Sequence, residues 1–298
     1  MSQHDLPEMF FVVGAPLSGN TTLLDFLTVP KRVGWIPQRL ANKPEKLHLA
    51  TRARRLNWPL LGEFFLERRS EWKSVPEPAR KEEFWEHYLP RFTPSEDQIY
   101  VPGPGDVSEE EVKKIREVIK EICFLQKRDR FVSTYSGFPR IRLLRSIFPE
   151  AKFIQILRDP RSVAYQMVKK NNRFKHQYWE QKDQLMGLLP EPLQARLQSL
   201  SDTPLNYCGV MVRWYHDLYK LEMGELPGED RLEVAYSDLL SRPEITLKKV
   251  MRFSGLDMDK RFKYFLKFHD IQYSNQRTNR NLDNEEAEEL ALAVSSTN

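Results

Sequence analysis

The stretch MFFVVGAPLSGNTTLLDFL, residues 9–27, decides the fold. Its apolar run predicts a buried strand, the Gly/Pro segment predicts a tight turn, and the remainder has the spacing of a helix. GAPLSGNT at 14–21 fits the phosphate-loop spacing G-x-x-x-x-G-K-[ST] at every position but one. Backbone N–H groups from Ser18 to Thr22 would point at an anion, and the helix dipole would favour it. We therefore expect an anion-binding junction between a strand and a helix.

Asn20 stands where a phosphate loop carries its lysine. That lysine supplies the cation that reaches the β- and γ-phosphates of a nucleoside triphosphate. No acidic residue ends an obvious Walker B strand either. The sequence therefore argues against an ATPase or kinase, and a P-loop phosphotransferase ranks third among the functional hypotheses. A glycine-containing turn that binds no ligand is the alternative at this loop.

Two further apolar runs, FIQIL at 153–157 and LEVAY at 232–236, have the character of buried strands. Each is followed by a helical pattern, as is the first run at 10–13, and this is the arrangement of βα units. We predict an α/β fold with a parallel sheet flanked by helices on both faces. The chain 1–298 is expected to form a single domain in which residues 31–130 are a helical insertion.

Two helices are marked by their ends. SEEEVKKIREVIKEICFLQK begins with a capping box formed by Ser108 and Glu111. Another helix is expected after Ser241, with Pro243 in its first turn and Gly255 as its stop.

Composition restricts the classes of partner. The chain has 46 Lys and Arg against 42 Asp and Glu, and this net charge of +4 is interspersed along the sequence, so nucleic-acid binding is not predicted. There is no signal-peptide pattern and no apolar run near the ~18 residues that span a bilayer, so we expect no membrane span and a cytoplasmic protein. Cys123 and Cys208 are the two cysteines, which fits a reducing compartment. No His, Cys, Asp and Glu set has metal-ligand spacing, so no metal is expected.

A second motif follows the run at 153–157. Arg158-Asp159-Pro160-Arg161 comes directly after this strand, and Pro160 suits the first turn of a helix. Guanidinium groups at such a junction can hold a phosphate by paired hydrogen bonds. Arginines bound to Asp159 or to another carboxylate are the alternative. A phosphate loop and an arginine site in one sheet would suit a ligand with two separated anionic ends.

Three stretches together resemble the PAPS-dependent sulfotransferases: GAPLSGNTTLL, FPEAKFIQILRDPRSVA and LEVAYSDLLSRPEITLKKVMRFSGL. They occur in the family's order and lie toward both ends of the chain. In the family the first binds the 5′-phosphosulfate of PAPS, the second binds its 3′-phosphate, and the third carries a tyrosine near the adenine. The resemblance implies a P-loop-like sulfotransferase fold, PAPS as cofactor, PAP as product and no metal. Residues 31–130 have no counterpart in this pattern.

The resemblance also assigns cofactor-binding residues. Arg158 matches the 3′-phosphate arginine, Tyr236 matches the adenine-side tyrosine, and Gln166 stands where the family has a serine donor. Arg277 and Arg280 are expected to reach the 3′-phosphate, as C-terminal basic residues do in the family. The phosphosulfate loop is matched by Pro16, Ser18, Gly19, Thr21 and Thr22, with Asn20 replacing its first threonine as a side-chain donor.

Leu17 is the main departure from the family pattern. The family has Lys or Arg at this place in the cofactor loop, and that cation neutralises the charge that grows on the bridging oxygen as the sulfuryl group leaves. A leucine cannot do this. Either another cation takes over, or the protein binds the nucleotide and transfers slowly or not at all.

Two residues are candidates for the catalytic base. The family's small-molecule branch uses a histidine that RFVSTYSGFPRI at 130–141 lacks. The glycosaminoglycan branch has a glutamate on the helix after the loop, and Asp25 occupies that position here, one helical turn after Thr21. A buried salt bridge is the alternative role for Asp25. His48 is the second candidate, with an ordinary surface histidine as its alternative.

The predicted function is transfer of a sulfuryl group from PAPS to a hydroxyl or amine of a small-molecule acceptor by in-line displacement. The alternative is a catalytically impaired relative that binds PAP or another nucleotide and acts as an interaction or regulatory protein. Aromatic residues of the insertion would wall the acceptor site or form plain core. They are Trp35, Trp58, Phe64, Phe65, Trp72 and Trp85.

Overall fold

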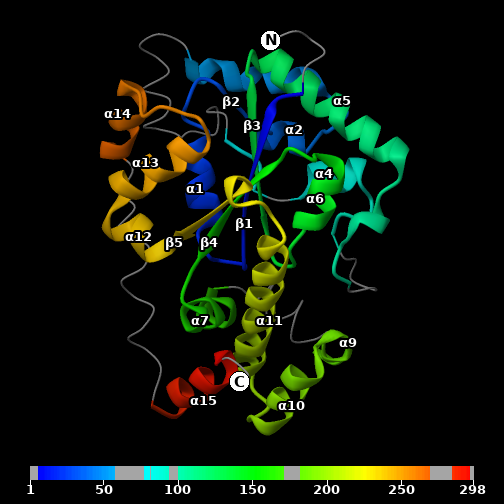
Figure 1. The fold of residues 1–298 in the computed structure, drawn as a ribbon, viewed down its shortest axis with the longest axis vertical. Helices are drawn as coiled ribbons and strands as arrows, with labels where there is room; N and C mark the ends of the chain where they lie inside the picture. The colour runs from blue at the N-terminus through cyan, green and yellow to red at the C-terminus, as the bar shows by residue number, and fades with distance from the viewer. Residues whose placement is uncertain are drawn as a thin grey trace.

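The computed structural model describes residues 6–57, 77–80, 82–93, 100–170, 182–268 and 284–295. Within these residues five strands form one parallel sheet in the order β2-β3-β1-β4-β5 (Figure 1). They are β1 (Glu8–Gly14), β2 (Val33–Gly34), β3 (Arg130–Ser136), β4 (Lys152–Leu157) and β5 (Arg231–Ala235). The predicted α/β class with a parallel sheet is confirmed.

The apolar runs identified three of the five strands, namely β1, β4 and β5. The sequence pattern does not predict β3, because Ser133 and Thr134 interrupt its apolar residues. Yet β3 pairs with β1 along its whole length, from Glu8 beside Arg130 to Gly14 beside Ser136. The short strand β2 pairs with β3 as well, so the segment expected as a helical insertion also supplies an edge strand of the sheet.

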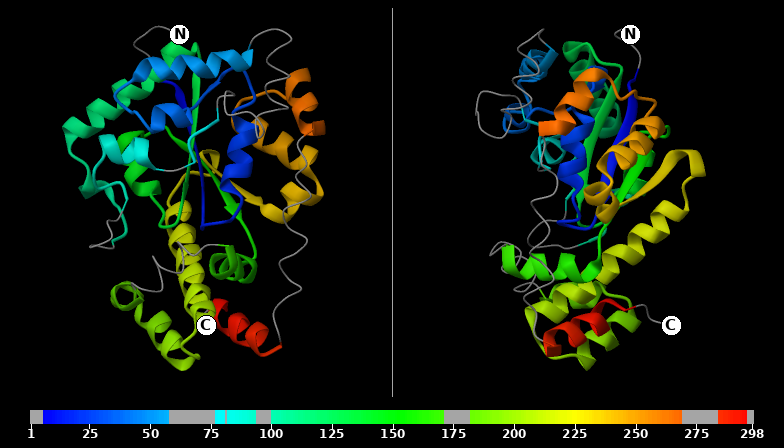
Figure 2. Two further views of the ribbon diagram at one scale, coloured as in Figure 1. Left: turned by 180° about the vertical axis from the view of Figure 1, so that it is seen from behind. Right: turned by 90° about the vertical axis from the view of Figure 1, so that its left-hand side faces the viewer.

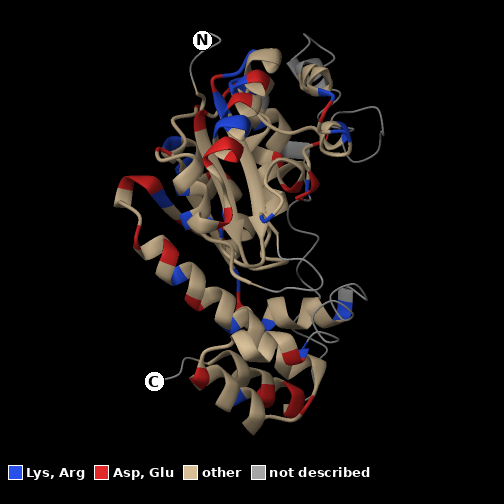
Figure 3. Cartoon of the chain, turned by 90° about the vertical axis from the view of Figure 1, so that its right-hand side faces the viewer, with Lys and Arg blue, Asp and Glu red and all other residues tan. Residues whose placement is uncertain are grey.

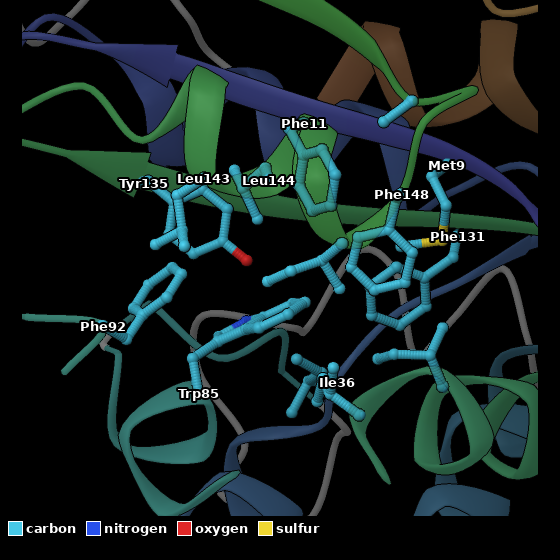
Figure 4. Packing of buried hydrophobic residues seen from close by; sticks show 14 of the residues in the cluster. Met9, Phe11, Ile36, Trp85, Phe92, Phe131, Tyr135, Leu143, Leu144 and Phe148 are labelled. Atoms are coloured by element: carbon cyan, nitrogen blue, oxygen red, sulfur yellow. The ribbon is translucent and has the colours of Figure 1, made fainter. Parts of the chain in front are cut away.

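The central strand β1 is buried on both faces. Its side chains alternate between two cores: the first contains Met9, Phe11 and Val13, and the second contains Phe10 and Val12. None of the five is more than 2% exposed. Figure 4 shows Phe11 among the aromatic rings of the first core. A strand covered on both faces needs a continuous apolar run, and this is why the sequence identified it.

Helices cover both faces of the sheet (Figures 1 and 2). On the face of the first core lie α2 (Gln38–Ala41), α4 (Glu83–Tyr88), α5 (Glu109–Gln126) and α6 (Ile141–Ile147). On the face of the second core lie α1 (Asn20–Leu27), α12 (Tyr236–Ser241), α13 (Pro243–Phe253) and α14 (Lys260–Phe268).

A third group of helices packs beyond the carboxyl ends of the strands, in the lower part of Figures 1 and 2. It has an apolar core of its own, and its long helix α11 runs from this core up to the sheet. The group consists of α7 (Pro160–Lys170), α9 (Lys182–Leu188), α10 (Glu191–Ser199), α11 (Pro204–Gly224) and α15 (Asn284–Val294). Three 3₁₀ helices complete the described elements: η1 (Leu47–Asn57), η2 (Pro104–Asp106) and η4 (Gly228–Asp230).

The two predicted helix ends are confirmed. In α5 the Ser108 N–H donates to Glu111 Oε2 at 2.7 Å and the Glu111 N–H donates back to Ser108 Oγ at 3.3 Å, which is a complete capping box. Helix α13 begins at Pro243, and the chain leaves it through Gly255 with a φ of +58°, a conformation that favours glycine.

Charges of both signs are intermixed along the helices (Figure 3). This matches the interspersed pattern of the sequence. Among the helices that the structure describes, none combines the length and the apolar character needed to cross a membrane.

Two tryptophans of the insertion are core residues. Trp35 and Trp85 are each 1% exposed, and the Trp85 ring stacks on Phe92 with 5.5 Å between ring centroids. These two tryptophans therefore form part of the core, which was the alternative to lining the acceptor site. The other aromatic residues expected at an acceptor site lie outside the described residues: Trp58, Phe64, Phe65 and Trp72.

Replacing Trp85 tests whether the insertion helps to stabilise the sheet. Trp85→Ala leaves a large cavity between α4 and β1, so we expect the free energy of unfolding to fall by about 3–5 kcal/mol. Phe124→Ala is the control, because Phe124 is 43% exposed on α5 and its loss should cost about 0.5 kcal/mol or less. Urea unfolding followed by circular dichroism measures both, and equal losses would contradict the packing described here.

Candidate functional site

The loop between β1 and α1 lies at the edge of the sheet formed by the carboxyl ends of the strands. It follows the central strand. Helix α1 begins at Asn20, and its first internal hydrogen bond runs from the Leu23 N–H to the Gly19 carbonyl at 3.2 Å. The N–H groups of Asn20, Thr21 and Thr22 therefore have no acceptor within the helix. They form the positive end of the helix dipole, which favours an anion.

Ser18 adds a hydroxyl to this loop. Its side chain is buried, and Oγ has no hydrogen-bond partner among the described residues. The backbone N–H of Ser18 donates to the Ala15 carbonyl at 3.3 Å, which closes the turn. A buried hydroxyl without a partner is costly, and a ligand oxygen at the loop would remove that cost.

The side chain of Asn20 bonds to the backbone of two strands and does not serve as a donor for an anion. Its amide nitrogen donates to the Gly14 carbonyl at 3.2 Å and to the Tyr135 carbonyl at 3.1 Å. These bonds tie the ends of β1 and β3 together. A Cβ atom at Gly14 would lie 2.9 Å from Asn20 Oδ1, so the glycine permits this close approach. The side-chain donor expected to bind an anion is thus engaged, and the loop donors are backbone N–H groups.

The structure brings Arg158 and Tyr236 to the same loop. Arg158 Nη1 donates to the Leu17 carbonyl at 2.7 Å, and its guanidinium carbon lies 5.0 Å from the centroid of the Tyr236 ring. The Tyr236 ring rests on Gly19, where a Cβ would come within 2.4 Å of it. Burial lowers the pKa of Arg158, and nearby Tyr236 and Asp159 oppose this, but an arginine remains charged.

Helix α7 starts directly after β4, with Pro160 at its first position as predicted. Gln166, one of its buried residues, has an Oε1 atom with no hydrogen-bond partner in the described part of the chain. Arg161 is exposed and donates through its backbone N–H and Nε to Asp159 Oδ1, at 3.1 and 3.3 Å. Arg161 therefore binds a carboxylate, which was the alternative to phosphate binding for the second motif. Arg158 instead turns toward the loop.

Asp25 lies on α1 and is 9% exposed. Its Oδ2 is 3.3 Å from Arg80 Nη2, so this buried carboxylate has the ion-pair partner that the alternative reading required. Arg80 belongs to the stretch 77–80, which is bound to the residues before α2: Ala79 N–H donates to the Ile36 carbonyl at 2.7 Å.

Of the remaining predicted residues, Pro16 and Leu17 belong to the loop, and His48 is not brought to it. His48 is exposed on η1, and η1 lies at the amino-terminal end of the sheet, at the top of Figure 1, far from the carboxyl edge. Arg277 and Arg280 lie outside the described residues. Pro16 is buried in the loop, and Leu17 takes a left-handed φ of +58° while packing against the core of the third helix group.

Sequence reasoning missed three residues at this edge. The Tyr219 hydroxyl on α11 donates to the Gly14 carbonyl at 3.2 Å, next to the loop. Arg140, which is 3% exposed, and Glu82 form a pair at the end of β3. No local pattern marks any of them, since they reach this edge of the sheet only through the sheet register and the packing of α11. Groups of metal-ligating side chains are absent from the described part of the chain.

An anion loop without a lysine, beside an arginine at the carboxyl edge of a parallel sheet, defines a phosphate-loop-like α/β protein. A family model described as the sulfotransferase family matches residues 7–260. The chain therefore belongs to the sulfotransferase family.

Two solved sulfotransferase structures, STF9 and STF1, agree with this fold. The sulfotransferase STF9 from Mycobacterium avium is 12% identical with a TM-score of 0.53, and the match covers 88% of this chain and 67% of STF9. STF1 from Mycobacterium tuberculosis H37Rv is 13% identical with a TM-score of 0.53, covering 88% and 71%. A sulfotransferase domain from the curacin biosynthetic pathway is 13% identical with a TM-score of 0.48, covering 96% of each chain. No curated protein matches the chain.

Substitution of Gly19 tests the contact between the loop and Tyr236. Gly19 has a φ of +104°, and an alanine there would place its methyl group in the Tyr236 ring. We expect Gly19→Ala to lower the free energy of unfolding by about 1–3 kcal/mol through backbone strain, with a further loss from the displaced ring. Gly105→Ala is the control, because a Cβ at Gly105 meets nothing within 4 Å. Urea unfolding decides, and equal stability of the two variants would contradict the contact.

Proposed function

We propose that the protein is a PAPS-dependent sulfotransferase that transfers a sulfuryl group to a hydroxyl or amine of a small molecule. The observation that carries this proposal is the convergence of all three sequence motifs at one edge of the sheet. The loop N–H groups and the buried Ser18 hydroxyl lie beside Arg158 and Tyr236, although the three segments are far apart in the sequence. When bound, PAPS supplies the sulfuryl group and leaves as PAP.

The roles of the residues follow from their chemistry. Backbone N–H groups of residues 18–22 and the Ser18 hydroxyl are donors for the phosphosulfate, because they are fixed dipoles at a helix N-terminus. Arg158 is a charged donor for the 3′-phosphate, with Gln166 as a second polar group on the same side. Tyr236 offers a ring for the adenine to contact. Arg277 and Arg280 are proposed to reach the 3′-phosphate.

Arg158 can replace in part the loop cation that Leu17 lacks. Its guanidinium donates to the carbonyl of Leu17 itself, so a positive charge lies beside the place where the family carries one. The charge that develops on a leaving phosphate oxygen is best stabilised by a fixed cation in a site without water. Both cysteines are unpaired and buried, and this supports our proposal that the protein works in the cytoplasm.

A catalytically impaired nucleotide-binding protein is the second candidate. Leu17 favours it, because the loop lacks the family's cation, and in an active enzyme Arg158 would have to stabilise the leaving oxygen as well as bind the 3′-phosphate. Binding of PAP without any PAPS turnover over a panel of phenols, alcohols and amines would select this candidate.

Calorimetric titration with PAP tests the nucleotide site. We expect wild-type binding at about micromolar dissociation constants and no heat with ATP as the control ligand. Arg158→Ala should weaken PAP binding roughly 30-fold or more, because it removes a charge-assisted contact worth about 2 kcal/mol or more. The matched control is Arg142→Ala, since Arg142 is exposed and bound to the exposed Glu225. Equal PAP affinity of wild type and Arg158→Ala would overturn the role of the second motif.

A further inference from the structure

A buried arginine holds a glutamate at the end of β3. Arg140 Nε donates to the Phe92 carbonyl at 2.7 Å, and its guanidinium lies on the Phe92 ring with 4.8 Å to the centroid. Arg140 Nη1 is 3.8 Å from Glu82 Oε1. The backbone contacts and the ring fix the guanidinium, so Arg140 fixes the carboxylate in turn.

The Glu82 carboxylate lies one strand away from the anion loop. The same Arg140 Nη1 that lies beside Glu82 donates to the carbonyl of Ser136, the last residue of β3, at 3.5 Å, so the carboxylate lies at the end of this strand. Ser136 is paired directly with Gly14, the residue at which the loop begins. The side chain of Ser136 is exposed, and 26% of the Glu82 side chain is exposed as well, so a small molecule can reach this place from solvent.

The sheet order separates two sides of the loop. Arg158 follows β4 and Tyr236 follows β5, so the residues proposed for the nucleotide lie on one side of β1. Glu82 meets the end of β3 on the other side. If the nucleotide lies along β4 and β5, the acceptor has to approach its transferable group from the β3 side. This step rests on the proposed function.

Glu82 is in an environment that makes a carboxylate more basic. Burial raises its pKa above the ordinary range, and the neighbouring charges of Glu86 and Glu83 on α4 add to this, while Arg140 and the backbone of Ser136 lower it. Two tyrosines face the same region, Tyr135 from β3 and Tyr219 from α11, and burial raises the pKa of each, so both stay neutral. A carboxylate whose pKa is raised toward the working pH is suited to accept a proton.

Asp25 differs from Glu82 in its ion-pair partner and in its exposure. Its partner Arg80 is two residues before Glu82 in the chain, so the Asp25–Arg80 pair holds the segment that carries Glu82. The Asp25 side chain is 12% exposed, less than half the exposure of Glu82. Asp25 therefore acts on the site as a positioning residue.

We infer that Glu82 is the proton acceptor of the sulfuryl transfer. The acceptor oxygen or nitrogen forms a bond to sulfur, while its proton passes to a carboxylate oxygen of Glu82. The bond between sulfur and the bridging oxygen breaks, and the electron pair stays on the phosphate oxygen of PAP. The proton then leaves Glu82 to solvent, and atoms and charge balance.

The first test needs no ligand. Carbon-13 spectra of protein labelled at glutamate carboxyl carbons should contain a signal with a raised pKa for Glu82 and another for Glu222, because burial raises the pKa of both. Glu82→Gln should remove the Glu82 signal. Glu86→Gln should move that signal to a lower pKa, because it removes a neighbouring negative charge. If no glutamate signal has a raised pKa, or if every such signal persists in Glu82→Gln, the inference is overturned.

The second test uses PAPS with water as the acceptor, at excess protein over hours, and measures PAP release against pH. Glu82→Gln should slow release by about 100-fold, because it removes the general base. Wild-type release should fall as pH drops through the raised pKa of Glu82, since only the ionised form accepts a proton. Asp25→Asn should keep this pH dependence, and Glu86→Gln should shift it to lower pH. If Glu82→Gln does not fold, Glu82→Asp takes its place, with a loss of roughly 10-fold or more and the pH dependence retained.

The outcomes separate the two proposals. Wild-type protein that does not bind PAP overturns the proposed function, and the inference with it. PAP binding that is intact in wild type and in the Glu82 variant, with equal release rates, overturns the inference alone. The same holds if wild-type release is no faster than in protein-free solution, or if Asp25→Asn abolishes release and Glu82→Gln does not.

Discussion

The pairing of β1 with β3 and β4 is the constraint on which the rest of the structure depends. Both partners are parallel to β1, so the carboxyl ends of three strands meet at one edge. A shift of the register by one residue would turn every β1 side chain to the opposite core and would part Gly14 from Ser136. The amide of Asn20 bonds to the ends of β1 and β3 and so fixes this register where the loop begins. Fold and site thus depend on the same contacts.

The two sides of this sheet edge carry arginines in different surroundings. Arg158 brings a permanent positive charge to one side of the loop, where burial weakens its screening by water. On the other side a buried arginine is fully engaged by carbonyl groups and a carboxylate. We propose that the first guanidinium binds a ligand, whereas the second holds protein groups in place. The same residue type has two tasks because its surroundings differ.

The sequence predicted those parts of the fold whose signals are local. Buried strands such as β4 have continuous apolar runs, and α5 and α13 have capping residues. The predicted positions of these elements are therefore correct. The strand β3 was missed because Ser133 and Thr134 interrupt its apolar residues, and their hydroxyl groups bond to Trp85 and to the Val12 carbonyl. The convergence of Arg158 and Tyr236 on the loop followed from motif order, while Glu82 carries no local signal at all. The role we propose for it depends on contacts across the fold, which periodicity and spacing do not encode.

The position of β1 also has a consequence for synthesis of the chain. This strand leaves the ribosome first, but its neighbours β3 and β4 begin only at Arg130 and Lys152. At about 5–20 residues per second, β1 spends on the order of ten seconds with both edges unpaired and its phenylalanines uncovered. Such a segment is exposed to aggregation until its partners arrive. The central strand that positions the site is therefore also the segment that waits longest for its partners during synthesis.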